Sequence, residues 1–222
     1  MAEKKFQRGY LFPFLKEKKT STERRFTAPM IRIRRKYEKK HIAWKVSDTP
    51  LEKYAEPFPQ EFSGYLNDRL ADSRKSMIRH RLLDVGVGTG NQWINFLNKN
   101  PDMEFNGTAL AKTMLHPEIK QKIKITTAAN LHNHFEPNTF DTIVSHYGTH
   151  GQELEALEDI IYLLKPGGEA VVTGISHNLF EKKLLLNAKK ANQNIFDIIH
   201  HKNIIDRIKG ESKWCYHIRK AS

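Results

Sequence analysis

The chain carries, at residues 83–90, the stretch Leu83-Asp84-Val85-Gly86-Val87-Gly88-Thr89-Gly90. Residues 81–85, with Leu82, Leu83 and Val85, predict a short and mainly apolar strand, and residues 91–98 predict the helix that follows. Glycines at such a junction permit positive φ angles and let a ligand approach the backbone without a Cβ in the way. The helix N-terminus also offers unpaired N–H groups to an anionic group. The stretch therefore predicts a ligand-binding loop at the carboxyl end of a strand.

The glycine spacing separates two classes of cofactor. Gly86, Gly88 and Gly90 give the pattern G-x-G-x-G, whereas dinucleotide-binding loops use G-x-G-x-x-G. Asn91 stands where that second pattern needs its third glycine. A dinucleotide is therefore disfavoured, and from this loop alone a coincidental glycine turn stays open.

Strand-like and helix-like stretches alternate along the rest of the chain. Further strands are predicted at residues 103–106, 122–127, 142–145 and 169–174. Helices are predicted at residues 61–79, 154–164 and, for most of their length, 179–200. Residues 204–208 and 214–218 predict a terminal antiparallel pair. This alternation predicts an α/β domain whose mainly parallel sheet is covered on both faces.

Two later stretches carry a resemblance to a known superfamily. Residues 138–145, Asn-Thr-Phe-Asp-Thr-Ile-Val-Ser, are similar to the pattern N-S-F-D-x-V-x-S, and residues 162–172 are similar to V-L-K-P-G-G-x-L-x-I. With the acid two places before G-x-G-x-G, these motifs resemble the class I S-adenosylmethionine (SAM)-dependent methyltransferases over residues 82–172. The resemblance implies a doubly wound, mainly parallel seven-stranded sheet and SAM as the cofactor.

The resemblance also implies a set of cofactor-binding residues. They follow the first four strands of the predicted sheet: Asp84, Val85, Gly86, Gly88, Thr89, Gly90, Ala109, Leu110, Asn130, Leu131, Ser145 and His146.

Two positions depart from the superfamily pattern. Ala109 stands where an acid usually accepts both ribose hydroxyls, and Thr127 stands where an acid often lies near the adenine amino group. A charge-assisted hydrogen bond contributes roughly 1.5–3 kcal/mol, so losing the ribose contact weakens SAM by about tenfold to a hundredfold. Asp102 and Glu104 lie near the second strand, and the amide of Asn130 is a candidate replacement at the adenine.

The loop after the fourth predicted strand is expected to border the methyl group and its acceptor. Tyr147 is expected to line this pocket, and His150 is a candidate proton acceptor from an oxygen or nitrogen nucleophile. The alternative is that His146 and His150 only satisfy polar groups of the loop. No metal site is expected at His132-Asn133-His134 or His200-His201, because neither has a carboxylate at convincing ligand spacing.

Positive charge is concentrated at the N-terminus. Residues 1–45 hold 15 Lys and Arg against 4 Asp and Glu, which accounts for +11 of the net charge of +12. Aromatic residues are interleaved with this charge. We expect a basic, aromatic-containing extension and linker at residues 1–59, followed by a methyltransferase-like domain at residues 60–222. Lys and Arg neutralise phosphates and aromatic rings stack on bases, so residues 1–45 predict an RNA or ribonucleoprotein partner.

The arm also admits other interpretations. It is compatible with a solubilising tail or with a mitochondrial leader, although Glu3, Glu17 and Glu23 argue against a leader. The single cysteine, Cys215, favours a reducing compartment, and no stretch has the apolar length of a membrane span.

Three functional hypotheses follow from the sequence. The first is a SAM-dependent methyltransferase acting on RNA or within a ribonucleoprotein. The second is a catalytically inactive, methyltransferase-like structural or assembly protein of a ribonucleoprotein, such as a mitochondrial ribosome. The third is a small-molecule methyltransferase. The glycine loop favours the first, and the neutral residues Ala109 and Thr127 favour the second.

Overall fold

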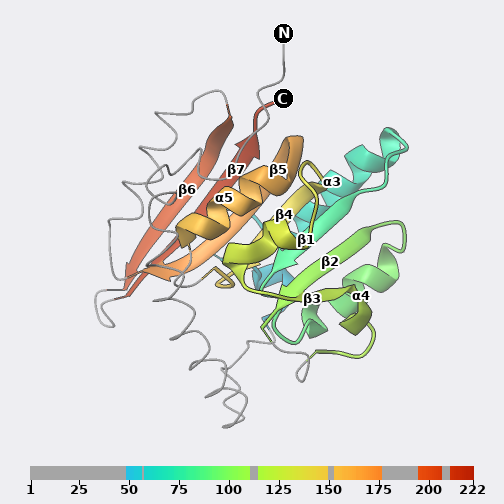
Figure 1. Cartoon of the computed structure of the whole chain (residues 1–222), viewed down its shortest axis with the longest axis horizontal. Helices are drawn as coiled ribbons and strands as arrows, with labels where there is room; N and C mark the ends of the chain where they lie inside the picture. Colours follow the sequence, from blue (N-terminus) through green and yellow to red (C-terminus); the bar gives the residue numbers. More distant parts are fainter. Residues whose placement is uncertain (1–48, 57, 111–114, 150–152, 177–194, 207–210) are drawn as a thin grey trace.

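A computed structural model describes residues 49–56, 58–110, 115–149, 153–176, 195–206 and 211–222. They form one seven-stranded sheet in the order β3-β2-β1-β4-β5-β7-β6 (Figure 1). Strands β1 to β5 pair in parallel, and β7 runs antiparallel to both of its neighbours. The strand order reverses direction at β1 and β4, so this pair marks the switch point where α/β sheets bind their ligands.

The strands have these bounds: β1 Arg81–Val85, β2 Glu104–Ala109, β3 Ile123–Ile125, β4 Phe140–His146, β5 Leu164–Ser176, β6 Phe196–Asp206 and β7 Glu211–Lys220. The helices are η1 Leu51–Lys53, α3 Phe62–Lys75, α4 Asn91–Lys99, η2 Lys120–Lys122, η3 Ala128–Asn133 and α5 Glu153–Leu163.

The helices cover both faces of the sheet. One hydrophobic cluster joins α5 and η3 to one face, and Figure 1 shows α5 in front of the sheet on that face. A second cluster joins η1, α3 and α4 to the other face. Successive residues of β1 enter opposite clusters, with Leu82 in the second and Leu83 in the first. A strand buried on both faces carries apolar side chains on each of them, as Leu82, Leu83 and Val85 do here.

The predicted fold class is confirmed, and the strands and helices from residue 61 to residue 176 occur where they were expected, with small shifts at their ends. β5 begins earlier than predicted because Leu164 already pairs with Phe140, whereas Glu169 pairs with Thr142. The intervening residues bulge out of the ladder, and Gly167 adopts a φ of 74° there. The predicted turn is therefore an irregularity inside one long strand.

The helix predicted over residues 179–200 is wrong from Phe196 onward, and residues 177–194 lie outside the described part of the chain. β6 starts at Phe196, which is buried, as Ile198 is in part, while Asp197 between them is exposed. This alternation has the period of a strand. β6 then pairs with β7 along its length, which confirms the terminal antiparallel pair.

The segment in front of α3 packs into the core of the body. We call residues 50–56 the strap. Within it, the side chains of Leu51, Tyr54 and Ala55 are buried in the same cluster as α3 and α4. Part of the stretch that was expected to be a linker is therefore an ordered cover on one face of the sheet.

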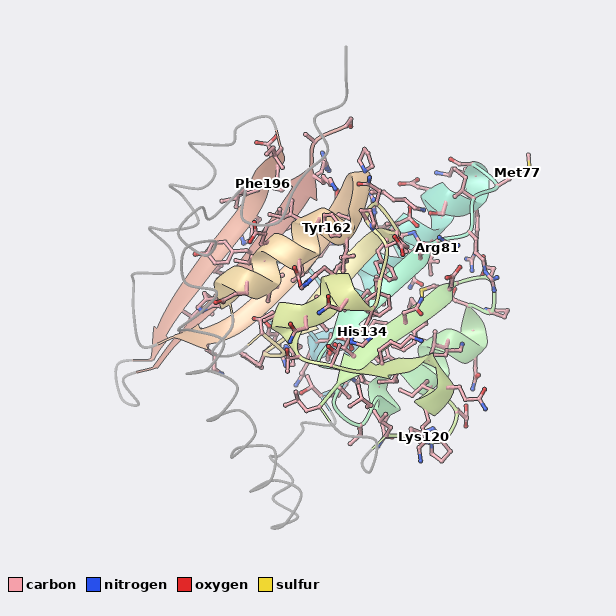
Figure 2. The ribbon with its side chains drawn as sticks, in the orientation of Figure 1. Met77, Arg81, Lys120, His134, Tyr162 and Phe196 are labelled. Atoms are coloured by element: carbon pink, nitrogen blue, oxygen red, sulfur yellow. The ribbon has the colours of Figure 1, made fainter. Side chains whose placement is uncertain are left out.

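The end of the sheet opposite the carboxyl ends of the parallel strands is held by a buried carboxylate. Glu169 accepts hydrogen bonds from Tyr65 of α3 at 2.9 Å, His217 at 2.8 Å and Arg219 at 2.6 Å. Burial raises the pKa of Glu169, but the hydrogen bonds from His217 and Arg219 outweigh it and bring the pKa to about 2. At this end the loop after α3 exposes Met77, with 95% of its side chain accessible (Figure 2).

Among the described residues, no helix is long and apolar enough to cross a membrane.

Candidate functional site

The glycine loop has the backbone conformation that its sequence predicts. Gly86, Gly88 and Gly90 adopt φ angles of 83°, 64° and 80°, a region that residues with a Cβ rarely enter. The amide groups of Gly86 and Val87 donate to the carbonyl of Thr108 in β2 at 3.1 and 2.9 Å. Gly90 ends the loop as the N-cap of α4. The loop therefore runs along the carboxyl ends of β1 and β2 and delivers the chain into a helix N-terminus.

Asp84 does not present its carboxylate to the solvent. It is fully buried, and the phenol of Tyr54 donates to both of its oxygens, at 3.0 and 2.8 Å. The indole Nε1 of Trp93 in α4 donates to the same carboxylate at 2.6 Å. Burial raises the pKa of Asp84 to about 7, and the two donors act against this rise. Asp84 thus stabilises the glycine loop through its buried contacts with Tyr54 and Trp93.

Tyr54 and Trp93 were missed at the sequence level. Tyr54 is 30 positions away from Asp84 in the chain, and Trp93 faces Asp84 only once α4 has formed. Neither residue belongs to a motif that the sequence shows. An aromatic residue with a polar tip near a buried acid was the only available signal.

The loop after β4 lies directly against the glycine loop. A Cβ on Gly148 would come within 1.9 Å of the carbonyl oxygen of Val85 and 2.9 Å of the Cα of Gly86. The hydroxyl of Ser145 is buried and donates to the same Val85 oxygen at 3.0 Å. The structure therefore brings together two predicted site segments, and Ser145 and Val85 serve the contact between them.

His146 is held in place by the strap. The backbone N–H of Ala55 donates to Nδ1 of His146 at 3.1 Å, and the ring of Tyr54 lies 4.8 Å from the imidazole. The ring of Tyr147 also lies near the imidazole, with 4.4 Å between the ring centroids. Burial lowers the pKa of His146 to about 4, with a further contribution from Lys213. His146 is therefore a neutral imidazole at pH 7.

Tyr147 has a strained backbone, with a φ of 61°. For a bulky residue this is a sparsely populated region, and such strain is concentrated at functional loops. Tyr147 lies beside His146 at the carboxyl end of β4, and its place near the acceptor stays a prediction. His150, the other predicted catalytic residue, lies outside the described residues.

The nucleoside end of the predicted site carries neutral groups. Ala109 is the last residue of β2 and is 8% exposed, and Leu110 beside it is 44% exposed. Asn130 is exposed on η3 and donates from its amide to Thr127 Oγ1 at 2.8 Å, while Leu131 points into the core.

The two acids near β2 lie at the wrong end of the strand to replace the missing carboxylate. Glu104 is the first residue of β2 and pairs with Arg81 at 3.0 Å, and Asp102 precedes it and binds Arg74 at 2.7 Å. The length of β2 separates them from Ala109, which is about 16 Å at 3.3 Å per residue.

Thr89 belongs to the loop itself. Its carbonyl accepts a hydrogen bond from the N–H of His116 at 2.8 Å, which ties the segment after β2 to the glycine loop. Among the described residues, no group of three or more His, Cys, Asp or Glu is placed to hold a metal ion. His132 instead pairs with Asp159 at 2.8 Å, and Cys215 is buried.

The sheet order, the reversed strand β7 and the glycine loop at the switch point define a class I methyltransferase fold. Residues 83–172 match the sequence model of the methyltransferase domain family. This match confirms the resemblance to the class I SAM-dependent methyltransferases over residues 83–172, and SAM is the cofactor that such a domain implies, as predicted.

The chain is similar to several solved structures of low identity. A protein from Galdieria sulphuraria described as a sarcosine dimethylglycine methyltransferase is 15% identical, with 79% of this chain and 94% of that one covered and a TM-score of 0.52. The [4+2]-cyclase SpnF is 17% identical over 73% and 83% of the two chains, with a TM-score of 0.49. An rRNA methylase from Streptococcus thermophilus is 14% identical over 65% and 88%, with a TM-score of 0.48. A comparison with curated protein sequences found no significant match.

Proposed function

We propose that the chain binds SAM at the glycine loop and transfers its methyl group to an acceptor in RNA or in a ribonucleoprotein. The observation that carries the proposal is the loop of Gly86, Gly88 and Gly90, whose three left-handed glycines stand at the switch point of a class I sheet. The buried hydroxyl of Thr149, in the loop after β4, has no hydrogen-bond partner among the described residues, as expected for a group that a ligand satisfies.

The residues of the site perform positioning more than proton chemistry. A bound SAM would supply a methyl group on a positively charged sulfur, which would leave as the neutral thioether when the acceptor's lone pair takes the methyl group in line. Such a displacement depends mainly on how the two reactants are held. The N–H groups at the start of α4 suit the carboxylate of the cofactor, and the glycines leave room for it. His146 and Tyr147 border the side on which the acceptor is expected.

The junction of the arm supports RNA as the acceptor. The described chain begins at residue 49, only five residues before Tyr54, whose phenol is bonded to Asp84 beneath the glycine loop. Five extended residues span at most about 18 Å. The basic segment ends nine residues before Tyr54, a span of at most about 32 Å, so a polyanion bound to the segment would lie within reach of the proposed methyl-transfer site.

Calorimetric titration of the full chain with SAM tests the first half of the proposal. We expect a dissociation constant in the micromolar range, because the loop is intact while the ribose carboxylate is missing. Gly88→Leu, which puts a side chain at a φ of 64° inside the loop, should abolish the heat. If the unchanged chain gives no heat at millimolar SAM, it is not an active enzyme. This result would favour the second candidate, a methyltransferase-like structural protein, which the neutral residues Ala109 and Thr127 also favour.

Deletion of residues 1–45 tests the second half. The truncated chain loses 15 basic side chains and should bind single-stranded RNA at least about tenfold more weakly, with a smaller slope of log affinity against log salt. Fluorescence anisotropy with labelled RNA at several salt concentrations measures both quantities. Unchanged SAM affinity in the truncated chain is the control for folding. Equal RNA affinity of the two chains would remove RNA from the proposal.

A further inference from the structure

The two flanks of the glycine loop are joined by one side-chain contact. Asp84 comes immediately before the turn of the loop, and Trp93 lies in the first turn of α4, just after it. The hydrogen bond of 2.6 Å from Trp93 Nε1 to Asp84 Oδ2 therefore closes the base of the loop. A contact that fixes both ends of a short loop restricts the conformations of the glycines between them, which are otherwise free to adopt many.

Tyr54 completes this contact from outside the loop. Its phenol donates to Oδ1 and Oδ2 of Asp84 at 3.0 and 2.8 Å, so it orients the carboxylate that Trp93 binds. Its ring is fixed in turn by Phe62 at 5.8 Å and by Trp93 at 5.9 Å between ring centroids. The whole group is buried, which makes each of these hydrogen bonds stronger than it would be in water.

The strap also contacts the end of β4, through Ala55 and His146. The next residue, Ala55, has a φ of 64° and donates its N–H to Nδ1 of His146. The hydroxyl of Thr173 also lies 3.3 Å from Nδ1, but it donates to the carbonyl of Ser145 at 3.2 Å. Because Nδ1 accepts from Ala55, the neutral imidazole carries its proton on Nε2, and Nε2 of His146 is then a hydrogen-bond donor.

We infer that Tyr54 is a positioning residue of the methyl-transfer site, which holds the glycine loop in its cofactor-binding form by acting through Asp84 and Trp93. The inference rests on the proposed binding of SAM at that loop. It gives the strap a definite role, because two adjacent residues set the geometry of the cofactor loop and the hydrogen-bonding direction of His146. The connection between the basic arm and the body is then part of the active site.

The test compares Tyr54→Phe with Tyr65→Phe. Both substitutions remove one buried phenol hydroxyl that donates to a carboxylate, and both leave the ring in place. Tyr65 bonds to Glu169 at the opposite end of the sheet, so it matches Tyr54 in chemistry but not in location. We expect Tyr54→Phe to weaken SAM by about tenfold or more in calorimetry, and Tyr65→Phe to bind SAM as the unchanged chain does.

A spectroscopic measurement reports the contact without any ligand. The chain has three tryptophans, so its indole N–H groups give few resonances in an ¹⁵N-labelled sample. Tyr54→Phe should move the Trp93 indole resonance, and Tyr65→Phe should leave it in place.

The outcomes separate the two proposals. If the unchanged chain binds SAM but Tyr54→Phe binds it equally well, or Tyr65→Phe loses as much, the positioning role is overturned while the proposed function stands. If the unchanged chain does not bind SAM, the proposed function fails. The Trp93 indole resonance then tests the role of Tyr54 by itself. A shift confined to Tyr54→Phe then supports the role of Tyr54 in ordering the loop, and an unmoved resonance overturns it.

Discussion

Ala109→Asp is expected to raise the affinity of the chain for SAM by about tenfold to a hundredfold. Ala109 ends β2 next to the glycine loop, where the superfamily pattern has an acid. A carboxylate at this position accepts hydrogen bonds from the two ribose hydroxyls, and hydrogen bonds to a charged group contribute roughly 1.5–3 kcal/mol. Calorimetric titration of both chains with SAM measures the gain.

Ala109→Asn is the matched control, because it adds nearly the same shape without the charge. It should gain much less, since a neutral amide offers one acceptor oxygen in place of two. An Asp variant that binds no better than the unchanged chain, while its thermal unfolding is unaltered, would show that the nucleoside does not lie against the end of β2. The placement of the cofactor in this site would then be wrong.

Gly148→Ala is expected to abolish SAM binding and to lower the free energy of unfolding by about 2–3 kcal/mol or more. The added Cβ would lie 1.9 Å from the carbonyl oxygen of Val85. This oxygen belongs to the backbone, so a change of side-chain rotamer cannot relieve the clash. The loop after β4 must therefore move away from the glycine loop. For a chain of this size the loss corresponds to a melting temperature about 5–10 °C lower, which circular dichroism measures.

Gly64→Ala is the control for the same chemical change elsewhere. A Cβ on Gly64 meets nothing within 4 Å, and the residue lies within α3, where Ala is the better helix former. This variant should melt at the same temperature or slightly higher and keep its SAM affinity. A Gly148→Ala chain that behaves like Gly64→Ala would mean that the two loops do not touch in solution.

The parts of the fold that follow from local sequence were predictable. The apolar run of β1, the positive φ angles of Gly86 to Gly90 and the breaker Pro166-Gly167-Gly168 are all properties of a few adjacent residues. These local signals locate the glycine loop and the succession of strands along the chain. The departure at Ala109 was also visible, because it depends on one position counted from a strand end.

Contacts between distant residues were not predictable in this way. Tyr54 reaches Asp84 across 30 positions of the chain, and its segment has the prolines and charges of a linker. Similarly, residues 196–200 contain enough apolar side chains for either a helix or a strand, and pairing with β7 determines the outcome. Tertiary contacts override local preference at both places.

β6 forms one outer edge of the sheet, and its register against β7 shifts between Ile198 and His200. Strands with regular free edges recruit further chains, which leads to aggregation. The extra residue, Ile199, twists the edge and breaks its row of hydrogen-bonding groups, although its own side chain is 44% exposed. A bulge of this kind interrupts the regular spacing that a further strand would need in order to pair with the edge.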